Sequence, residues 1–203
     1  MPRIRADSIA EHKALTRQQI LGAAQDLIAE VGSADISLGE IAAAVGIGRT
    51  TLYEYFTDRD DVIASLVEDE LPDVVANLLL TVPGGLAPPV HLAEVAERTV
   101  HFVANDRVLG LILHREVGRM SAEAQHRIRV AHSDLVSEVA SIYAAGVEQG
   151  SLRDLPIDLA GRFIQDTIMS AARAVIAAPD PDQRLPEILS AMRSFLLNGI
   201  ATA

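Results

Sequence analysis

The segment SLGEIAAAVGIGRTTLYEYFTDR, residues 37–59, decides the fold of this 203-residue chain. Ser37 and Glu40 stand three residues apart, which is the spacing of a capping box and predicts the start of a helix. Apolar residues then recur at helical spacing until a Gly-Ile-Gly turn at 46–48 ends the pattern, because glycine adopts left-handed backbone angles at little cost. A second short helix is predicted over residues 49–56. Two short helices joined by a tight glycine turn are typical of the helix-turn-helix, whose second helix enters the major groove of DNA.

The residues at the start of the second helix are the ones that this motif presents to DNA. Arg49 opens that helix, a position that favours contact with a base or a phosphate; the alternative is a surface arginine that begins a helix. Thr50 and Thr51 can cap the helix and still bond a phosphate. Tyr55 is expected on the groove side. The full set of predicted DNA contacts, with the flanking positions, is Arg17, Ser37, Leu38, Gly48, Arg49, Thr50, Thr51, Tyr53, Tyr55 and Arg59.

About the first 70 residues resemble the tetracycline-repressor (TetR) family. TRQQILGAA from residue 16 and LIAEVG ending at residue 32 look like its first helix, SLGEIAAAVGIGRTTLYEYF like its second and third, and DRDDVI like the start of its fourth. The resemblance implies that the Tyr53 hydroxyl reaches a phosphate; the alternative is a half-buried packing residue. Three positions depart from the family pattern: Gly48 replaces a small polar residue, Thr50 replaces glycine, proline or alanine, and Arg59 replaces lysine.

Composition excludes several classes of protein. The chain has no cysteine, so it has no disulfide, no thiolate metal site and no cysteine nucleophile. The apolar fraction of 49% suffices for a sizeable core, and aromatics make up only 3%, so that core is mainly aliphatic. Residues 1–13 are polar, without the apolar centre of a signal peptide, and no apolar run approaches the roughly 18–20 residues of a membrane span. We therefore expect a cytoplasmic protein with no membrane partner.

The acidic charge balance of the chain argues against DNA binding. The formal net charge is -11, and residues 1–66 contain four more acidic than basic side chains. Nucleic-acid-binding domains are commonly basic. Helix-turn-helix modules, however, also hold phosphates through hydroxyl and backbone N–H groups, so they need few cations. We therefore expect weak non-specific binding and specific binding that depends on a dimer.

Apolar spacing predicts an all-α chain of about nine helices. A Thr16–Gln19 capping box is expected to open the first helix, and Asp58 is expected to cap a helix running from Arg59 toward residue 80, with a kink or break near Pro72. Residues 81–89 are predicted to form a loop and residues 151–156 a surface connection. The further helices are expected at about 90–104, 107–117, 121–148, 157–177 and 184–198. We divide the chain into a three-helix, helix-turn-helix DNA-binding domain, residues 1–60, and a helical ligand-binding and dimerisation domain, residues 61–203.

The last predicted helices present a stripe that suits an interface. The resemblance implies that these helices pair with a second copy as a four-helix bundle, so that a homodimer reads a palindromic operator; burial within one chain is the alternative for part of the stripe. The predicted interface residues are Leu185, Ile188, Leu189, Met192, Phe195 and Leu196.

The central helices are expected to hold a small-molecule effector. Their candidate lining residues are Phe102, His114, Arg115, Tyr143, Phe163, Asp166 and Met169, although each also suits a core or a solvated position. The few aromatics favour an aliphatic ligand over a flat aromatic cation.

No motif suggests a cofactor, a metal site or a catalytic residue. The chain has no Gly-rich phosphate loop, no GxSxG and no HExxH. The sequence therefore predicts a ligand-responsive DNA-binding transcriptional regulator, most simply a repressor released from its operator by a small molecule. The alternative is a helical interaction protein that has lost sequence-specific DNA binding.

Overall fold

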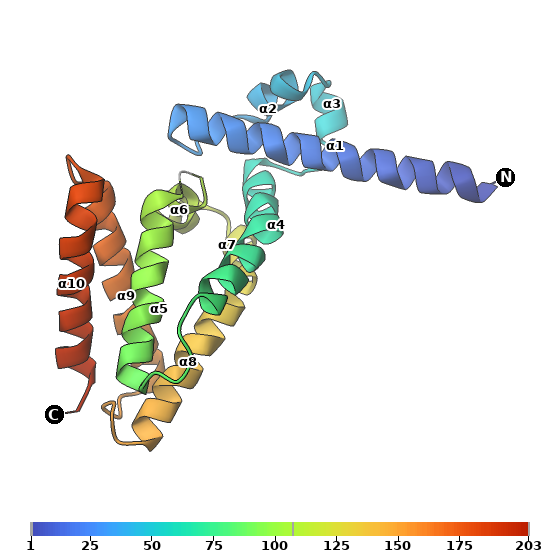
Figure 1. The fold of residues 1–203 in the computed structure, drawn as a ribbon. Coiled ribbons are helices and arrows are strands. Elements are labelled where there is room, and N and C mark those ends of the chain that lie inside the picture. Colours follow the sequence, from blue (N-terminus) through green and yellow to red (C-terminus); the bar gives the residue numbers. More distant parts are fainter. Residues whose placement is uncertain (1, 107, 203) are drawn as a thin grey trace.

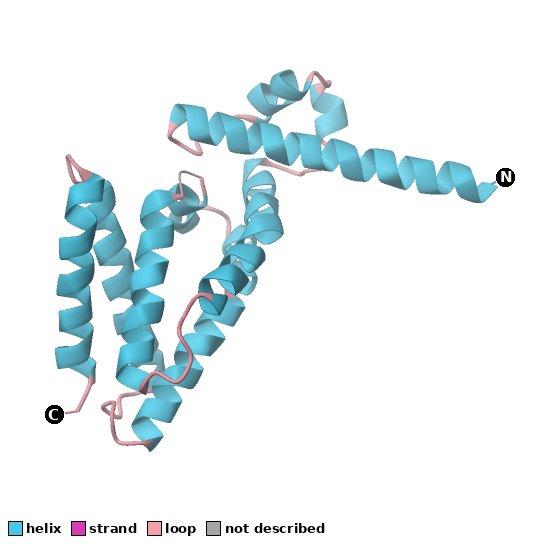
Figure 2. Ribbon diagram, in the orientation of Figure 1, coloured by secondary structure: helices cyan, strands magenta, loops and turns pink. Residues whose placement is uncertain are grey.

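The computed structural model describes residues 2–106 and 108–202, with side chains from residue 8 onward, and this part of the chain is almost entirely helical (Figures 1 and 2). The elements in order are α1 (Pro2–Val31), α2 (Leu38–Val45), α3 (Arg49–Leu52), α4 (Arg59–Leu80), α5 (Pro88–Asn105), α6 (Leu109–Leu111), the π-helix η1 (Ile112–Glu116), the 3-10 helix η2 (Val117–Arg119), α7 (Ala122–Ala131), α8 (Ser133–Glu148), α9 (Ile157–Ile176) and α10 (Pro181–Ile200). The described residues form no strand beyond an isolated bridge between Leu152 and Ala201. The all-α prediction is confirmed.

The helices form two connected parts. Helix α1 lies across one end of the molecule with α2 and α3 against it, and α4 leads from this end into the other helices (Figure 1). Helix α5 packs against α8, α9 and α10, and α4 packs against α7. One cluster of buried side chains joins α1–α4 to α6, η1 and α7, and a second lies among α5, α8, α9 and α10. The helix-turn-helix end therefore shares its core with the segment that follows α5.

The first helix is longer than the sequence predicted. It begins at Pro2, and the Thr16 hydroxyl donates to the His12 carbonyl 2.9 Å away, one turn earlier in the same helix. Thr16 is buried. The predicted Thr16–Gln19 capping box is therefore wrong, because Thr16 bonds back to the preceding turn instead of ending it.

Helix α4 begins and ends where predicted. The Asp58 carboxylate accepts a hydrogen bond from the Asp61 N–H at 2.8 Å, and the helix continues to Leu80. Pro72 lies within it and is exposed, and the helix is continuous through it. A break near residue 71 is therefore absent, because packing on both sides of Pro72 outweighs the loss of one backbone hydrogen bond.

The segment after α5 differs most from the prediction. One helix was predicted over residues 107–117, of which residue 107 lies outside the described part. The structure instead has three short helical segments there, α6, η1 and η2. The Asp106 carboxylate accepts from the N–H groups of Val108 and Leu109 at 2.9 and 2.6 Å, which starts a new turn. The predicted helix 121–148 is divided at His132 into α7 and α8. Leu152 is buried, so the 151–156 segment is not wholly a surface connection.

Candidate DNA-binding surface and effector site

The helix-turn-helix forms as the capping residues predicted. The Ser37 hydroxyl accepts from the Glu40 N–H at 3.2 Å, and the Glu40 carboxylate accepts from the Ser37 N–H at 2.7 Å. These hydrogen bonds hold the pKa of Glu40 below its ordinary value. Gly46 ends α2 with a φ of 77°, and its N–H donates to Ala42 and Ala43. A side chain at this φ is strained, so Gly46 is required by the turn.

Helix α3 is short, and its first residues face solvent. It spans Arg49–Leu52 and continues as tighter turns to Phe56, whose N–H donates to the Leu52 carbonyl at 3.1 Å. Gly48, Arg49 and Thr50 are exposed, and Tyr53 is 58% exposed, so the packing alternative for Tyr53 does not apply in the isolated chain.

The other candidate contacts of the motif are less accessible. Tyr55 packs against the first core cluster, so its expected exposure on the groove side is wrong: the helical turn directs it back toward the protein. Leu38 also packs on this core, and Thr51 is half-buried. Ser37 is exposed, but its hydroxyl and N–H are both used by the capping box.

Two arginines predicted to contact DNA bind other parts of the chain instead. Arg17 donates to the Asp69 carboxylate at 2.6 Å and lies over the Phe56 ring. Arg59 donates from Nε to the Ala34 carbonyl at 2.6 Å and from Nη2 to the Glu116 carboxylate at 3.1 Å. These contacts engage both guanidinium groups with other parts of the chain, although Arg17 keeps 37% of its side chain exposed. Contact of either residue with DNA stays a prediction.

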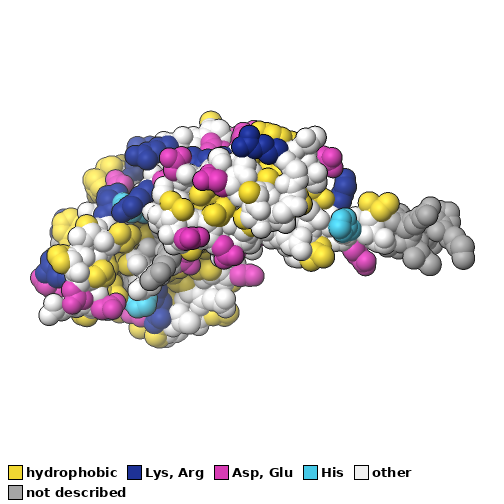
Figure 3. All heavy atoms as spheres, turned by 90° about the horizontal axis from the view of Figure 1, so that it is seen from above, with side chains coloured by type: hydrophobic (Ala, Val, Ile, Leu, Met, Phe, Trp, Pro, Cys, Tyr) yellow, Lys and Arg dark blue, Asp and Glu magenta, His cyan; other side chains and the backbone are white. Residues whose placement is uncertain are grey.

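The face that carries α1–α3 has mixed charge. Seen from this end, Lys and Arg side chains are interspersed with Asp and Glu and do not merge into one basic patch (Figure 3). A surface of this kind gives little non-specific attraction for DNA, because that term scales with the number of phosphates neutralised.

A set of ion pairs connects α4 to the segment after α5. The Arg59–Glu116 pair joins the start of α4 to η1, and Asp60 accepts from the Ser121 N–H at 2.7 Å. Glu116 is buried, with 7% of its surface exposed. Arg59 also binds the Ala34 carbonyl, three residues before Ser37, so this one side chain connects η1 to the segment that enters α2.

Arg127 on α7 makes a second set of contacts with α4. Its guanidinium donates to Asp61 at 2.7 Å, to Ser65 at 2.8 Å and to both carboxylate oxygens of Glu68 at 2.9 and 2.5 Å. The Glu68 carboxylate and then Asp61 raise the pKa of Arg127. Burial alone raises the pKa of Asp61, but hydrogen bonds from Thr57 and Arg127 leave it lowered overall.

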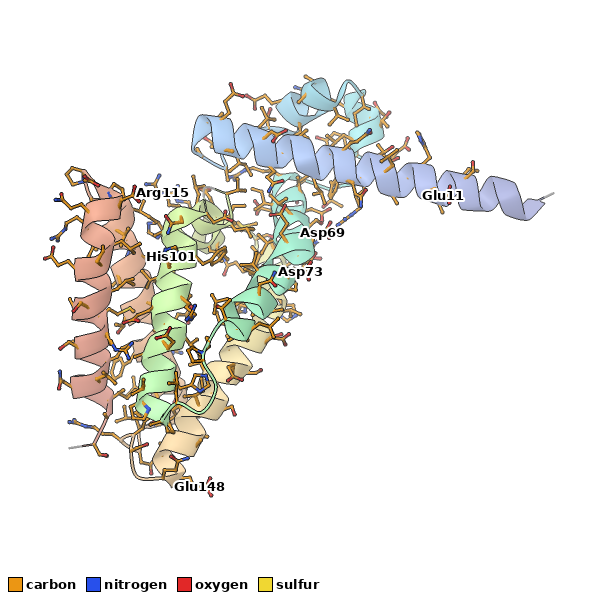
Figure 4. The ribbon with its side chains drawn as sticks, viewed as in Figure 1. Glu11, Asp69, Asp73, His101, Arg115 and Glu148 are labelled. Atoms are coloured by element: carbon orange, nitrogen blue, oxygen red, sulfur yellow. The ribbon has the colours of Figure 1, made fainter. Side chains whose placement is uncertain are left out.

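The π-helix carries a histidine with an unused ring nitrogen. His114 Nδ1 is buried and finds no hydrogen-bond partner among the described residues. Burial, followed by the positive charges of Arg173 on α9 and of Arg115, lowers the pKa of His114. His101 and Arg115 lie near the end of α5 that faces the helix-turn-helix (Figure 4). A π-helix is rare and frequently occurs at functional sites, so η1 is a candidate part of an effector site.

The seven residues predicted to line an effector pocket do not gather in one place. Tyr143 is buried, and its hydroxyl donates to the Arg153 carbonyl and accepts from the Leu155 N–H at 2.7 and 2.8 Å, which secures the 151–156 connection. Phe163 and Asp166 lie on the outer side of α9. Phe102 packs against both core clusters and Met169 against the second; Arg115 is exposed.

An apolar groove of about 900 Å³ runs between α9 and α10. Phe163 is 53% and Phe195 67% exposed there. Of the six predicted interface residues, Ile188, Met192, Phe195 and Leu196 line the groove, whereas Leu185 and Leu189 pack within the chain on the second core cluster. Large aromatic side chains left this accessible mark a surface that binds another apolar surface.

A smaller hollow of about 460 Å³ lies at the opposite end from the helix-turn-helix, between the loop before α5 and helix α8. His91 Nε2 and Glu138 Oε1 lie 3.9 Å apart at its edge. Among the residues described, no His, Asp and Glu cluster suits a metal ion, and no helix has the length and apolar character needed to cross a membrane.

Two family models match the chain and together cover more than half of it. Residues 20–66 match the model described as bacterial regulatory proteins, tetR family. Residues 86–173 match the model of a tetracyclin repressor-like C-terminal domain.

Individual relatives have low sequence identity to this chain, but the similarity extends over most of both sequences. A fatty acid metabolism regulator protein of Bacillus subtilis is 24% identical over 151 residues, 74% of this chain and 78% of the relative. The transcriptional repressor KstR2 of Rhodococcus jostii is 26% identical over 195 residues, 92% of this chain and 91% of the relative. The crystal structure of the regulator FadR from Bacillus subtilis in complex with stearoyl-CoA superposes with a TM-score of 0.72 at 22% identity, over 90% of this chain and 98% of that one.

Proposed function

The chain belongs to the TetR family of bacterial regulatory proteins, and we propose that it acts as a homodimeric repressor that leaves its operator when an aliphatic effector binds beside η1. Members of this family are DNA-binding transcriptional regulators and not enzymes, and this chain is such a regulator. The observation that carries the proposal is the solvent-facing start of α3, held by the capped α2 on one side and by the Arg59–Glu116 pair on the other.

The proposed DNA contacts are the exposed residues of the motif. They are Gly48, Arg49, Thr50 and Tyr53, with Ser37 at the start of α2. Hydroxyl and backbone groups at such positions fix a protein on phosphates, and one or a few longer side chains read base edges. Residues 1–60 and 61–203 remain our proposed division between DNA binding and regulation, with α4 crossing the boundary.

The proposed partner for the α9–α10 groove is a second copy of this chain. A two-fold axis places the same groove and the same exposed phenylalanines opposite each other, so each chain covers the apolar surface of the other. Two recognition helices are then held at a fixed separation, as a palindromic operator requires.

The proposed effector is an amphiphile with a long aliphatic chain and an anionic head group, such as a fatty acyl-CoA. Stearoyl-CoA, which is bound in the crystal structure of FadR from Bacillus subtilis, belongs to this class. In this chain Ile112 and Leu113 of η1 pack with the aliphatic first core cluster, and the charges of Arg173 and Arg115 act on His114, whose Nδ1 has no hydrogen-bond partner among the described residues. Arginine binds phosphate and carboxylate oxygens well, so these two residues suit the head group.

The proposed response runs through Glu116. An effector that favours another position of η1 shifts Glu116, and with it Arg59 and the Ala34 carbonyl in front of α2. To empty the operator almost completely, from 1% to 99% release, the effector must favour the released state by about 5.5 kcal/mol. Loss of a buried ion pair and of its neighbouring contacts is of this order when both chains respond.

The test is a mobility-shift assay with duplex DNA from upstream of the chain's own coding sequence. We expect a retarded complex that stearoyl-CoA dissociates and that coenzyme A or stearate alone leaves intact. If stearoyl-CoA has no effect on a genuine complex, the effector class is wrong but the DNA-binding role stands. If neither this duplex nor any duplex selected from random sequence is retarded, the chain is the helical interaction protein that the acidic charge balance suggests.

A further inference from the structure

Gly39 is the second residue of α2, and its backbone does not need glycine. The described glycines with a positive φ are Gly32, Gly46, Gly85 and Gly150, and Gly39 is not among them. Glycine inside a helix is less favourable than alanine because it loses more backbone freedom on folding. In a helix of only eight residues this cost is a large share of the helix's own stability, so some other contact explains the absence of a side chain.

That contact is with Arg49, the first residue of α3. A Cβ atom built on Gly39 would lie 2.8 Å from both Cζ and Nε of Arg49, and closer still to Nη2. The Arg49 guanidinium therefore rests directly on the backbone of α2, in space that any other residue at position 39 would fill. Arg49 is exposed, and no ion pair among the described residues draws its guanidinium away from α2.

The position has a consequence for DNA binding. In a helix-turn-helix the N-terminal residues of the second helix reach base edges, whereas the first helix crosses the sugar-phosphate backbone. A guanidinium that lies on α2 is therefore directed to the strand that α2 crosses, although Arg49 belongs to α3.

We propose that Gly39 is a positioning residue for Arg49, and that it directs this arginine to a DNA phosphate instead of a base edge. Gly39 itself touches no DNA in this arrangement. Its contribution is the missing side chain, which allows the guanidinium to lie against the backbone of α2. Sequence preference then comes from the other exposed residues of the motif, and Arg49 adds affinity that is the same for every base pair. The inference rests on DNA binding by the chain, which the unsubstituted protein tests on its own in the same assay.

The experiment is a double-mutant cycle on a duplex selected from random sequence with the full-length protein. Dissociation constants are measured by fluorescence anisotropy at several KCl concentrations for the unsubstituted protein, Gly39→Ala, Arg49→Ala and the double variant. Arg49→Ala should weaken binding roughly tenfold, the size of one charge-assisted contact. The loss should be equal on the selected duplex and on its single-base-pair variants, and the salt slope should fall by about one.

Gly39→Ala should weaken binding several-fold while Arg49 is present and change nothing in the Arg49→Ala background. The matched control is Gly22→Ala on α1, the same substitution at a helix position where an added Cβ meets no atom within 4 Å. This control should leave DNA binding unchanged. The thermal midpoint of Gly39→Ala should stay level or rise, which separates displacement of Arg49 from loss of the fold.

Three results would overturn the proposal. An Arg49→Ala loss confined to one base pair makes Arg49 a base reader. A Gly39→Ala loss of equal size in both backgrounds makes Gly39 a structural residue that does not act through Arg49. Unchanged binding by Gly39→Ala, with Arg49→Ala impaired, shows that the guanidinium does not need this position.

Discussion

At the scale of single residues, the Arg59–Glu116 pair offers a direct measure of how α4 is held to η1. Glu116 is nearly buried, whereas Arg59 keeps about a third of its side chain in solvent. Arg59→Ala leaves a buried carboxylate without its partner and should lower the free energy of unfolding by about 2–3 kcal/mol. Glu116→Gln keeps an acceptor for Arg59 and should cost about 1 kcal/mol. Urea denaturation of both variants checks the order; equal losses would show that Glu116 is not paired in solution.

His114 should make stability depend on pH in a predictable direction. Its pKa is lowered from 6.5 by burial, then by Arg173 and Arg115, so the folded chain binds a proton less readily than the unfolded chain. The stabilising contribution is therefore complete above about pH 6.5 and declines as the pH falls toward the folded-state pKa.

The measurement is the urea midpoint of the unsubstituted protein and of His114→Gln across roughly pH 8 to 5, a window that contains the ordinary histidine pKa. The difference between the two curves isolates His114 from the other histidines. We expect the unsubstituted protein to lose stability more steeply below about pH 6.5. Parallel curves would mean that His114 titrates alike in the folded and unfolded chains.

Residues whose role is set by near neighbours in sequence were predictable. Ser37, Gly46 and Asp58 each act within four positions of themselves, and all three cap or end a helix as predicted. Arg17 and Arg59 were not predictable, because their partners lie 52 and 57 positions away. A motif position that faces DNA in the family pattern does not reveal an acidic partner contributed by a distant helix.

At the scale of the elements, one guanidinium on α7 adds several polar contacts with α4 to the apolar packing between these helices. Arg127 binds Asp61, Ser65 and Glu68, which are spaced three to four residues apart on one face of α4. Lysine has the charge but not the planar set of donors that reaches all three. Arg127→Lys should therefore lower the free energy of unfolding by about 1–2 kcal/mol.

Chemical denaturation checks this value, with Arg129→Lys as the control, because Arg129 is an exposed arginine on the same helix. The control should be within about 0.5 kcal/mol of the unsubstituted protein, as expected of a surface position. If Arg127→Lys behaves like the control, the contacts with α4 do not contribute to stability.

Helix ends were predictable where the capping residue is close in sequence to the helix end. They were not predictable where contacts with distant residues decide where the helix ends. The ends of α4 follow from Asp58 and from the loop predicted at 81–89, whereas α5 begins at Pro88, two residues earlier than predicted, because proline suits the first turn of a helix. The division of the predicted 121–148 helix at His132 has no Gly or Pro to signal it. Its ring Nδ1 lies 2.6 Å from the Ile128 carbonyl, so the side chain occupies an acceptor at the end of α7. The helical spacing of apolar residues continues through His132, so the sequence pattern predicts one helix where the structure has two.

At the scale of the whole molecule, regulation requires that two distant surfaces act together. The exposed start of α3 and the α9–α10 groove lie on different parts of the chain, joined through α4, η1 and α5. The groove could be anticipated from the apolar stripe on α10, because periodicity shows which helix face avoids water. The proposed effector site could not be anticipated, because its candidate residues come from helices whose relative positions depend on long-range packing, and Tyr143 and Phe163 lie elsewhere in the structure.

The assembly itself gives the last prediction. Stable dimers bury about 1,200–2,000 Å² in total, and we expect the apolar groove between α9 and α10, with its exposed Phe163 and Phe195, to lie at the centre of such an interface. Phe195 is 67% exposed in the single chain, so Phe195→Asp should spare the protomer fold and fail only on association. The new carboxylate would lie in an apolar contact near Asp166, where desolvation and like charge both oppose pairing.

Sedimentation velocity should show a helical monomer for Phe195→Asp, and binding to a palindromic duplex should fall by at least a factor of 100, because each recognition helix then binds its half-site alone. Leu80→Asp is the matched control: Leu80 is 82% exposed at the end of α4, away from the groove, and its variant should remain a dimer with unchanged affinity. Substitution of Met192 by a charged residue is less informative, since Met192 is buried within its own chain and its replacement should also destabilise the protomer. A Phe195→Asp protein that sediments as a dimer would place the interface on another face. A Phe195→Asp monomer could also bind the palindrome as tightly as the unsubstituted protein. The two half-sites would then be bound independently, and the proposal that a symmetric dimer binds the operator would be wrong.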